Sequence, residues 1–286
     1  MELSNRDLYN RAKEILSKNK DIEYFDGEIY AILMKASGYE SFTELVLNFD
    51  KECPNPQYFY RNLNRLIAGE PLQYILEEAP FLDYMISISE DVLIPRPETE
   101  MLVLETIKYI NKNNLNHKII ADVCTGSGCI AVAMQKEYKN STVFALDKYE
   151  NVLMIAKKNF EKYQLPIICL QGDKVEPLIK RNIKVDILIS NPPYVENIND
   201  IEKKVLEHEP INAIYIQDGT AFYENYFKNY QNIMNKNFLM AFEINYDQEE
   251  KLSFLIKNYF DLNKIEYEFK KDLYGKTRYL FIKGVN

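Results

Sequence analysis

The stretch Ile187-Leu188-Ile189-Ser190-Asn191-Pro192-Pro193-Tyr194 decides the fold of this chain. Its first four residues are apolar or small and predict a short buried strand, which the Asn-Pro-Pro-Tyr sequence must end. Proline has no backbone N–H and its φ is fixed, so two in a row cannot continue a central ladder. The stretch therefore predicts a rigid corner at the carboxyl end of a strand, which is where open α/β sheets bind their ligands.

The chemistry of this corner, Asn191–Tyr194, suits a planar –NH2 group. The prolines offer no N–H donor to compete for the carbonyl groups of Asn191 and Pro192, Asn191 adds a side-chain carbonyl, and Tyr194 adds a flat face with a hydroxyl. Two converging acceptors can hold both hydrogens of an –NH2 group and aim its lone pair at an electrophile. A loop that merely contains two prolines is the competing interpretation. It is the weaker one here, because the corner follows a strand and lies downstream of a nucleotide-type loop.

That loop is rich in glycine. Residues 118–123 predict a strand, and Cys124-Thr125-Gly126-Ser127-Gly128 predicts the turn into a helix, which together form the first βα unit of a Rossmann-like sheet. Glycines in such a turn let backbone amides approach a ligand closely. The loop is not a full G-x-G-x-x-G motif, because Cys124 occupies the first glycine position and the third glycine is missing. By itself it is a weak indication of a nucleotide site.

Acidic residues follow the next two predicted strands, 142–147 and 167–171. Asp147 ends the first of them, roughly 20 residues after the glycine loop, where an acidic side chain would hold a ribose diol. Capping of the following helix explains Asp147 equally well until the glycine loop is considered with it. The carboxylate of Asp173 could accept a hydrogen bond from an adenine amino group, with Lys174 beside it. These strand ends predict a cofactor cleft next to an acceptor site.

Length and composition bound the class of protein. The 286 residues include 35 basic and 43 acidic ones, a net charge of −8, and 47% are hydrophobic, which indicates a globular protein of one large or two ordinary domains. Such a chain lacks the basic footprint of a protein that binds free nucleic acid. No apolar run is long enough to span a membrane and the start lacks signal-peptide character, so we expect a cytoplasmic protein.

Few residues are available for metal binding or for a catalytic triad. The four cysteines are scattered without a CxxC pair and are expected to serve as small apolar residues. His117 and His208 are the only histidines of the sequence, which disfavours both a His-based metal site and a Ser-His-Asp triad. We therefore expect a site without a metal.

The chain divides into three parts by its patterns. Residues 1–72 carry apolar residues at helical spacing and predict a small helical bundle that recognises a partner. Residues 73–95 alternate apolar and polar positions and predict a β-hairpin linker. Residues 96–286 alternate strands and helices and predict an α/β domain that carries the cofactor cleft and the acceptor site, with a first helix from Thr99. Arg96 stands between two prolines at its start, and a well-capped helix start explains it as well as a direct functional role does.

Together these features resemble the class I S-adenosylmethionine-dependent methyltransferases, in which Asn-Pro-Pro-Tyr is the signature of enzymes that methylate a planar amide or amino nitrogen. Within that class the chain resembles, nearly from end to end, the peptide-release-factor glutamine N5-methyltransferases. The Arg96–Glu100 run distinguishes it from the ribosomal-protein glutamine methyltransferases, which have a different segment there. The resemblance rests on segments spread along the chain: Gly69–Ile75, Ile94–Glu100, Cys124–Gly128, Asp147, Gln171–Asp173, Asn191–Tyr194, Glu209-Pro210 and Lys271–Arg278.

The resemblance implies a fold, a cofactor and a substrate. The fold is an N-terminal helical bundle, a hairpin and a seven-stranded Rossmann-like sheet. Separately, we expect a monomer. The cofactor is S-adenosylmethionine, and the substrate is the glutamine of the Gly-Gly-Gln motif in class 1 peptide chain release factors. The residues implied to grip the glutamine amide, the first of them also near the cofactor, are Asn191, Pro192, Pro193 and Tyr194. The implied cofactor residues are Asp122, Cys124, Thr125, Gly126, Ser127 and Gly128 for the methionine part, Asp147 for the ribose, and Asp173 and Lys174 for the adenine.

Two alternatives stay open. A methyltransferase acting on the exocyclic nitrogen of adenine in DNA or RNA also uses Asn-Pro-Pro-Tyr and needs a flipped base, but the net charge of −8 argues against it. The other alternative is a cofactor-binding or scaffolding protein without catalysis, suggested by Cys124 and Asn245, each of which replaces a glycine of the family pattern. Two further departures are Glu98 for an aspartate and Glu77-Glu78 where a glycine is usual. None of the four touches the acceptor corner, whose completeness argues for an enzyme.

Overall fold

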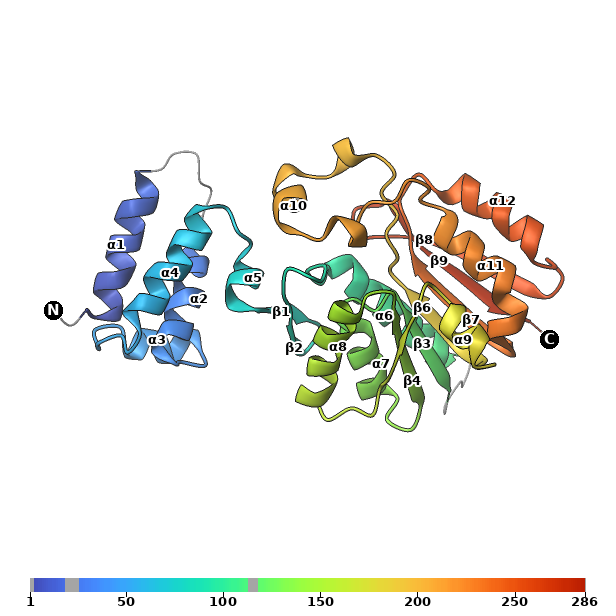
Figure 1. The fold of residues 1–286 in the computed structure, drawn as a ribbon, viewed down its shortest axis with the longest axis horizontal. Coiled ribbons are helices and arrows are strands. Elements are labelled where there is room, and N and C mark those ends of the chain that lie inside the picture. Colours follow the sequence, from blue (N-terminus) through green and yellow to red (C-terminus); the bar gives the residue numbers. More distant parts are fainter. Residues whose placement is uncertain (1–2, 19–25, 113–117, 286) are drawn as a thin grey trace. The chain divides into compact units, whose positions relative to one another are not determined.

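Residues 3–18, 26–112 and 118–285 are described by the structure, a computed structural model (Figure 1). The chain folds as two units, Met1–Glu78 and Ala79–Asn286, each with its own buried core. The functional boundaries expected at residues 72 and 95 stay predictions. His117 lies outside the described residues.

The first unit is a helical bundle whose apolar stripes face one another. In the first helix Leu8, Ala12 and Leu16 are buried at a spacing that places them on one face. The hydroxyl of Ser4 accepts a hydrogen bond from the backbone N–H of Asp7 at 3.1 Å and caps that helix. The predicted bundle is confirmed. Its helices are α1 (Asn5–Ser17), α2 (Asp26–Ser37), α3 (Phe42–Leu47), α4 (Pro56–Ile67) and α5 (Leu72–Leu76).

The segment that follows differs from the hairpin expected over residues 73–95. It begins with the helix α5, because Leu72, Ile75 and Leu76 have helical spacing and pack on the core of the bundle. Burial of these side chains outweighs the local strand signal. The hairpin that comes next is shorter than predicted and consists of β1 (Glu78–Phe81) and β2 (Tyr84–Ser87).

The second unit is built on a seven-stranded sheet in the order β5-β4-β3-β6-β7-β9-β8. The first five strands of that order are parallel, and β9 and β8 close the sheet with antiparallel pairs. This confirms the predicted Rossmann-like α/β fold. The strands are β3 (Ile119–Val123), β4 (Thr142–Asp147), β5 (Ile168–Gln171), β6 (Val185–Ser190), β7 (Met234–Glu243), β8 (Ile265–Lys271) and β9 (Thr277–Gly284).

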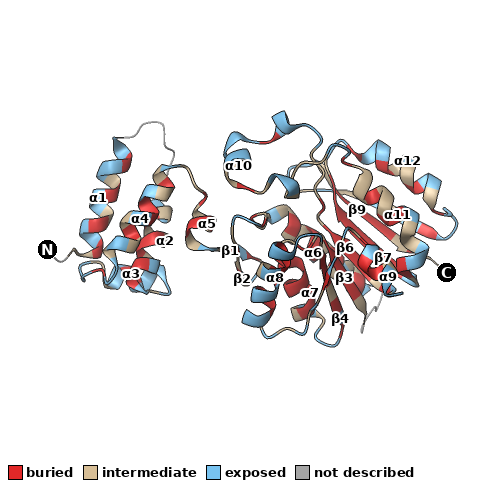
Figure 2. Cartoon of the chain, in the orientation of Figure 1, coloured by how far each residue is buried: buried red, intermediate tan, exposed pale blue. Residues whose placement is uncertain are grey.

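Helices cover both faces of this sheet, so its central strands are buried almost throughout (Figure 2). That burial explains why β3 and β6 are nearly continuous apolar runs and do not alternate. One face carries α6 (Pro97–Lys112), α7 (Cys129–Glu137) and α8 (Glu150–Lys162), and the other carries α9 (Glu176–Lys180), α11 (Ala221–Ile233) and α12 (Glu249–Tyr259) (Figure 1). Short helices interrupt the segment between β6 and α11, namely η1 (Ile198–Asp200), α10 (Lys203–His208) and η2 (Ile211–Ala213).

Strand register brings the predicted site segments to one edge. Val123 at the end of β3 is paired with Leu146 of β4 and with Ser190 of β6, and Asp147 is paired with Gln171. Because these strands are parallel, the loops that follow them emerge side by side. The glycine loop, the two acidic strand ends and the Asn-Pro-Pro-Tyr corner therefore meet at the carboxyl edge of the sheet. Within the described part of the chain, no helix is both long and apolar enough to cross a membrane.

Candidate active site

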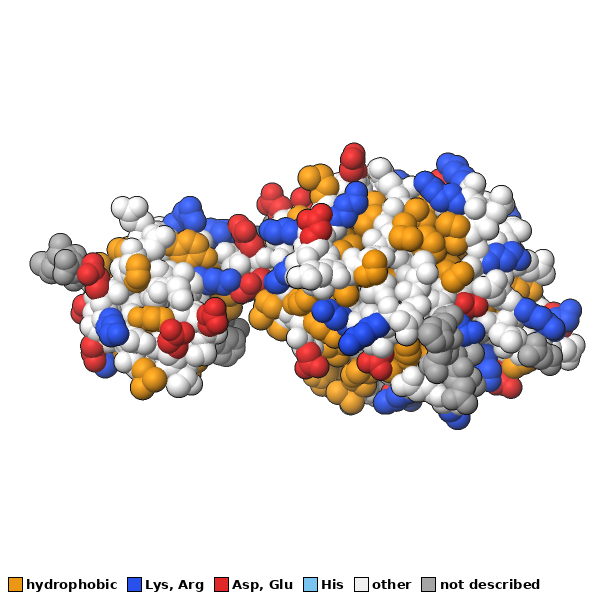
Figure 3. All heavy atoms as spheres, turned by 90° about the horizontal axis from the view of Figure 1, so that it is seen from below, with side chains coloured by type: hydrophobic (Ala, Val, Ile, Leu, Met, Phe, Trp, Pro, Cys, Tyr) orange, Lys and Arg blue, Asp and Glu red, His pale blue; other side chains and the backbone are white. Residues whose placement is uncertain are grey.

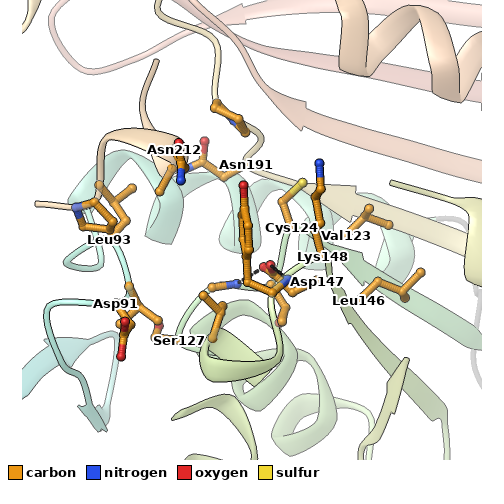
Figure 4. A pocket seen from close by; sticks show the side chains of 18 of the residues that line it. Asp91, Leu93, Val123, Cys124, Ser127, Leu146, Asp147, Lys148, Asn191 and Asn212 are labelled. Carbon is orange, nitrogen blue, oxygen red and sulfur yellow. Dashed lines mark hydrogen bonds between the residues drawn. The ribbon is translucent and has the colours of Figure 1, made fainter. Parts of the chain in front are cut away.

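A cavity of about 470 Å³ lies at this carboxyl edge, a size typical of small-molecule sites. Its walls come from the glycine loop, the ends of β4 and β5, and the Asn-Pro-Pro-Tyr corner that follows β6. Two segments outside the sheet, residues 90–96 and 210–216, complete them. In Figure 4, Asn191 and Asn212 lie towards the top of the view, and Asp147 and Ser127 lie below them. Among the described residues, no group of His, Cys, Asp or Glu side chains is placed to hold a metal ion.

The glycine loop, Cys124–Gly128, follows β3 in backbone conformations that favour glycine. Gly126 and Gly128 have φ of +54° and +80°. A Cβ on Gly128 would lie 2.6 Å from the ring of Phe160, so this glycine is needed for the close packing of α7 on α8. A Cβ on Gly126 would meet no atom within 4 Å, and since Gly126 lines the cavity, its missing side chain leaves space there for a ligand.

Asp122 supports this loop from beneath and does not line the cavity. It is fully buried, and its Oδ2 accepts hydrogen bonds from Thr125 Oγ1 at 2.5 Å and from the backbone N–H of Ala131 at 3.1 Å. Its other oxygen, Oδ1, has no hydrogen-bond partner among the described residues. Burial raises the pKa of the Asp122 carboxyl to about 7. Through these two hydrogen bonds, Asp122 holds the glycine loop in its conformation.

The two acidic strand ends both line the cavity, but they differ in their surroundings. The carboxylate of Asp147 accepts hydrogen bonds from the backbone N–H groups of Gly126 and Tyr149, both at 3.2 Å, and burial raises its pKa. Asp173 is exposed and forms an ion pair with the neighbouring Lys174 at 3.1 Å. The ammonium group of Lys174 lies 4.8 Å from the centre of the Phe222 ring, which gives the cavity a flat apolar surface at this end.

The acceptor corner begins where β6 ends at Ser190, as the two prolines predict. Asn191 and Pro193 line the cavity, whereas Pro192 is buried and Tyr194 does not line it. The hydroxyl of Tyr194 donates a hydrogen bond to Glu243 Oε1 at 3.0 Å. Within the described residues, no hydrogen bond is made to the backbone carbonyl of Asn191 or of Pro192. The corner therefore offers unpaired acceptors next to the cavity.

Sequence reasoning missed the residues that hold this corner. The side-chain amide of Asn191 donates to Thr99 Oγ1 at 2.9 Å, and Thr99 Oγ1 donates to Glu243 Oε2 at 2.7 Å. Arg96, for which the sequence allows two interpretations, lines the cavity and is ion-paired with the buried carboxylate of Glu209. Glu243 could have been suspected from its place at the end of a predicted buried strand, because ionised side chains are rarely buried without partners. Its partners lie far away in the sequence.

The fold and site belong to a known class of enzyme. The family model for the methyltransferase small domain matches residues 99–249, which include β3 to β7 and the acceptor corner. The 16S rRNA N2 G1207 methyltransferase of Thermus thermophilus, in complex with AdoMet and guanosine, has a similar fold, with a TM-score of 0.52 and 14% identity over 73% of this chain and 50% of that one. The chain is a methyltransferase whose methyl donor is S-adenosylmethionine, as the sequence predicted.

Relatives that align over most of the chain identify the family within this class. The chain is 32% identical over 287 residues to the release factor glutamine methyltransferase of Mycoplasma mycoides, across 98% of this chain and 99% of that one. It is 36% identical over 225 residues to the release factor glutamine methyltransferase of Bacillus subtilis, across 77% of each chain. The chain belongs to the release factor glutamine methyltransferase family, so the resemblance inferred from its motifs is confirmed.

Proposed function

We propose that this enzyme methylates the side-chain amide nitrogen, N5, of the glutamine in the Gly-Gly-Gln motif of class 1 peptide chain release factors. The observation that carries the proposal is the acceptor corner on the cofactor cavity, where Asn191 and Pro193 line the wall and the carbonyls of Asn191 and Pro192 accept no hydrogen bond among the described residues. A primary amide presents two N–H groups that match such acceptors. The names of the relatives, release factor glutamine methyltransferase, support the same substrate.

The cofactor site is assigned to the opposite side of the cavity. The backbone of Cys124–Gly128 would surround the methionine part, Asp147 would accept from the ribose hydroxyls, and Asp173 with Lys174 would flank the adenine. The open space at Gly126 and the cavity-lining Phe222 fit a ligand with a ribose and a flat base. When bound, S-adenosylmethionine supplies an electrophilic sulfonium methyl group.

The task of the acceptor corner is to make a poor nucleophile react. The lone pair of an amide nitrogen is delocalised, so both N–H bonds must be polarised as the new bond forms. The side-chain carbonyl of Asn191 and the backbone carbonyl of Pro192 are the acceptors that do this, preorganised and shielded from water. No general base is required, since the proton can leave after methylation. Burial holds the pKa of Tyr194 well above its usual value, so its hydroxyl stays protonated and keeps its bond to Glu243.

The net charge of −8 and the mixed charges on one face support a protein substrate over free nucleic acid. On the face of the second unit in Figure 3, Lys and Arg side chains are interspersed with apolar, Asp and Glu side chains. Binding to nucleic-acid backbones relies on clustered basic residues. We assign recognition of the release factor in part to the helical bundle, and we place the enzyme in the cytoplasm, where translation termination occurs.

Methyl transfer from labelled S-adenosylmethionine tests this proposal. The acceptors are a purified class 1 release factor, the same factor with the glutamine of its Gly-Gly-Gln motif replaced by alanine, and duplex DNA. We expect label on the intact factor alone. Label on DNA would support the adenine-methylating alternative, and equal label on both forms of the factor would exclude the Gly-Gly-Gln glutamine as the target.

A further inference from the structure

A chain of hydrogen bonds runs beneath the acceptor corner and joins both of its ends to one carboxylate. Glu243, the last residue of β7, is 2% exposed. One of its oxygens accepts from the hydroxyl of Tyr194 at 3.0 Å, and the other accepts from the hydroxyl of Thr99 at 2.7 Å. Thr99, 4% exposed in the first turns of α6, in turn accepts from the side-chain amide of Asn191 at 2.9 Å.

The direction of these bonds follows from the chemistry of the carboxylate. Both hydroxyls donate to the carboxylate of Glu243, which only accepts hydrogen bonds in its ionised form. Burial raises the pKa of this carboxyl, whereas the two donated hydrogen bonds and the nearby Arg278 guanidinium act in the opposite direction and favour the ionised form. Once the proton of Thr99 points at Glu243, its oxygen can only accept from Asn191. Asn191 therefore presents its –NH2 group to Thr99, and its Oδ1 is left for a ligand in the cavity.

The sheet holds the carboxylate in place. Phe242 of β7 pairs with Ser190 of β6, which places Glu243 beside Asn191, and the backbone carbonyl of Glu243 accepts from the buried hydroxyl of Tyr223 at 2.7 Å. Two neighbouring strands and the start of α6 thus converge on one point. Such support keeps a site side chain in a single orientation.

We propose that Glu243 and Thr99 are positioning residues, which set the orientation of the Asn191 amide so that its oxygen, and not its nitrogen, faces the acceptor. This inference rests on the proposed function, because it assigns the free Oδ1 to an N–H of the substrate amide. Loss of the Thr99 hydroxyl leaves the Asn191 amide free to turn, and a turned amide would present a donor to a donor.

A double-mutant cycle tests the inference. Thr99→Val keeps the shape of the side chain but removes the hydroxyl, and Thr99→Ser is the matched control that keeps it. We expect Thr99→Val to lower kcat for labelled transfer to the release factor by about 10- to 100-fold, with KM and cofactor Kd nearly unchanged, and Thr99→Ser to restore most of kcat. In the Asn191→Ala background, Thr99→Val should cost less than about twofold, because the group on which it acts is gone. If the reductions in kcat caused by the two changes multiply in the double variant, the inference is overturned.

A second measurement needs no methyl acceptor, so it distinguishes a failure of this inference from a failure of the proposed function. If the wild type transfers no label to any release factor, the proposed function fails, and the inference is decided by the side-chain amide resonances of Asn191 in the 15N-labelled enzyme, assigned with Asn191→Asp. We expect these resonances to shift in Thr99→Val and in Glu243→Gln, but to stay near the wild-type position in Thr99→Ser. Unchanged resonances in Thr99→Val would overturn the inference whatever the substrate is.

Discussion

The glycine loop and the acceptor corner contribute to the same cavity, but they are held in different ways. The loop is held over sequence separations of 3 to 32 residues: the hydroxyl of Thr125 donates to Asp122, the backbone N–H of Gly126 donates to Asp147, and the backbone carbonyl of Ser127 accepts from Asn159. The corner is held by Thr99 and Glu243, which lie 92 residues from Asn191 and 49 residues from Tyr194 respectively. The loop, which we assign to the cofactor, is thus fixed by contacts within the β3–α8 part of the chain, and the corner, which we assign to the substrate, by longer-range contacts with α6 and β7.

The largest effect is expected on kcat, for a substitution in the corner that leaves cofactor binding nearly unchanged. Asn191→Ala removes one of the acceptors for the amide, so we expect kcat to fall by about 100- to 1,000-fold, as for the loss of a preorganised transition-state contact. Cofactor Kd should change by less than about threefold, which is no more than the weak end of the range for one hydrogen bond. Single-turnover transfer and calorimetric titration measure the two quantities. An unchanged kcat would refute the role of Asn191.

The next effect separates two glycines within the loop. Gly128→Ala combines a positive φ with a clash against Phe160, and we expect it to lower the free energy of unfolding by about 2–4 kcal/mol. Gly126→Ala is its matched control, with a positive φ but no clash, and should cost about 1–2 kcal/mol. The new methyl group of Gly126→Ala enters the cavity. We therefore expect this variant to bind the cofactor more weakly than its loss of folding stability alone would explain. Urea unfolding and titration check both, and equal unfolding energies would contradict the packing argument.

A smaller effect is expected at the end of the cavity that we assign to the ribose. Asp147→Ala should raise cofactor Kd by about 10- to 100-fold, the range for a hydrogen bond to a charged group, while kcat at saturating cofactor changes little. The matched control is Asp173→Ala, whose more exposed carboxylate should contribute less. The comparison between loop and corner breaks down if Asp147→Ala lowers kcat as much as Asn191→Ala does.

A pH dependence of stability is expected at Asp122, beneath the loop. The folded-state pKa of this carboxyl, about 7, is raised by burial above its ordinary value, so the folded state holds the proton more tightly than the unfolded state. Its contribution to stability is therefore fully present below the ordinary pKa of about 4, and it is lost as the pH rises from there to about 7. Relative to Asp122→Asn, the wild type should lose about 1.4 kcal/mol for each pH unit over this window. Urea unfolding of both proteins between about pH 5 and pH 8 measures it, and a constant difference would mean that Asp122 is ionised throughout.

The sequence predicted the fold well where local signals were strong. The prolines after Ser190 end β6 where expected, and the apolar run Thr142–Asp147 is β4. It failed at Leu72–Leu76, where contact with the bundle core overrides a strand pattern. Of the site, the sequence located the glycine loop, both acidic strand ends and the corner at the edge that they share. It could not show that Asp122 lies beneath the loop, because that depends on burial.

No local motif indicates how the Asn191 amide is oriented or what the Tyr194 hydroxyl contacts. Both depend on Thr99 and Glu243, which share no local motif with the corner and meet it only through the pairing of β6 with β7 and the packing of α6. Long-range polar contacts of this kind are invisible to spacing arguments. They can be found only once the strand order is known.

The most direct test of this account is to map the transferred methyl group. A class 1 release factor treated with the enzyme and S-adenosylmethionine is digested, and the peptide that carries the Gly-Gly-Gln motif is sequenced by tandem mass spectrometry. The account predicts one added methyl group, on the side-chain amide nitrogen of that glutamine, and none after treatment with Asn191→Ala for the same time. A methyl group on any other residue, or an equally methylated glutamine with Asn191→Ala, would contradict it.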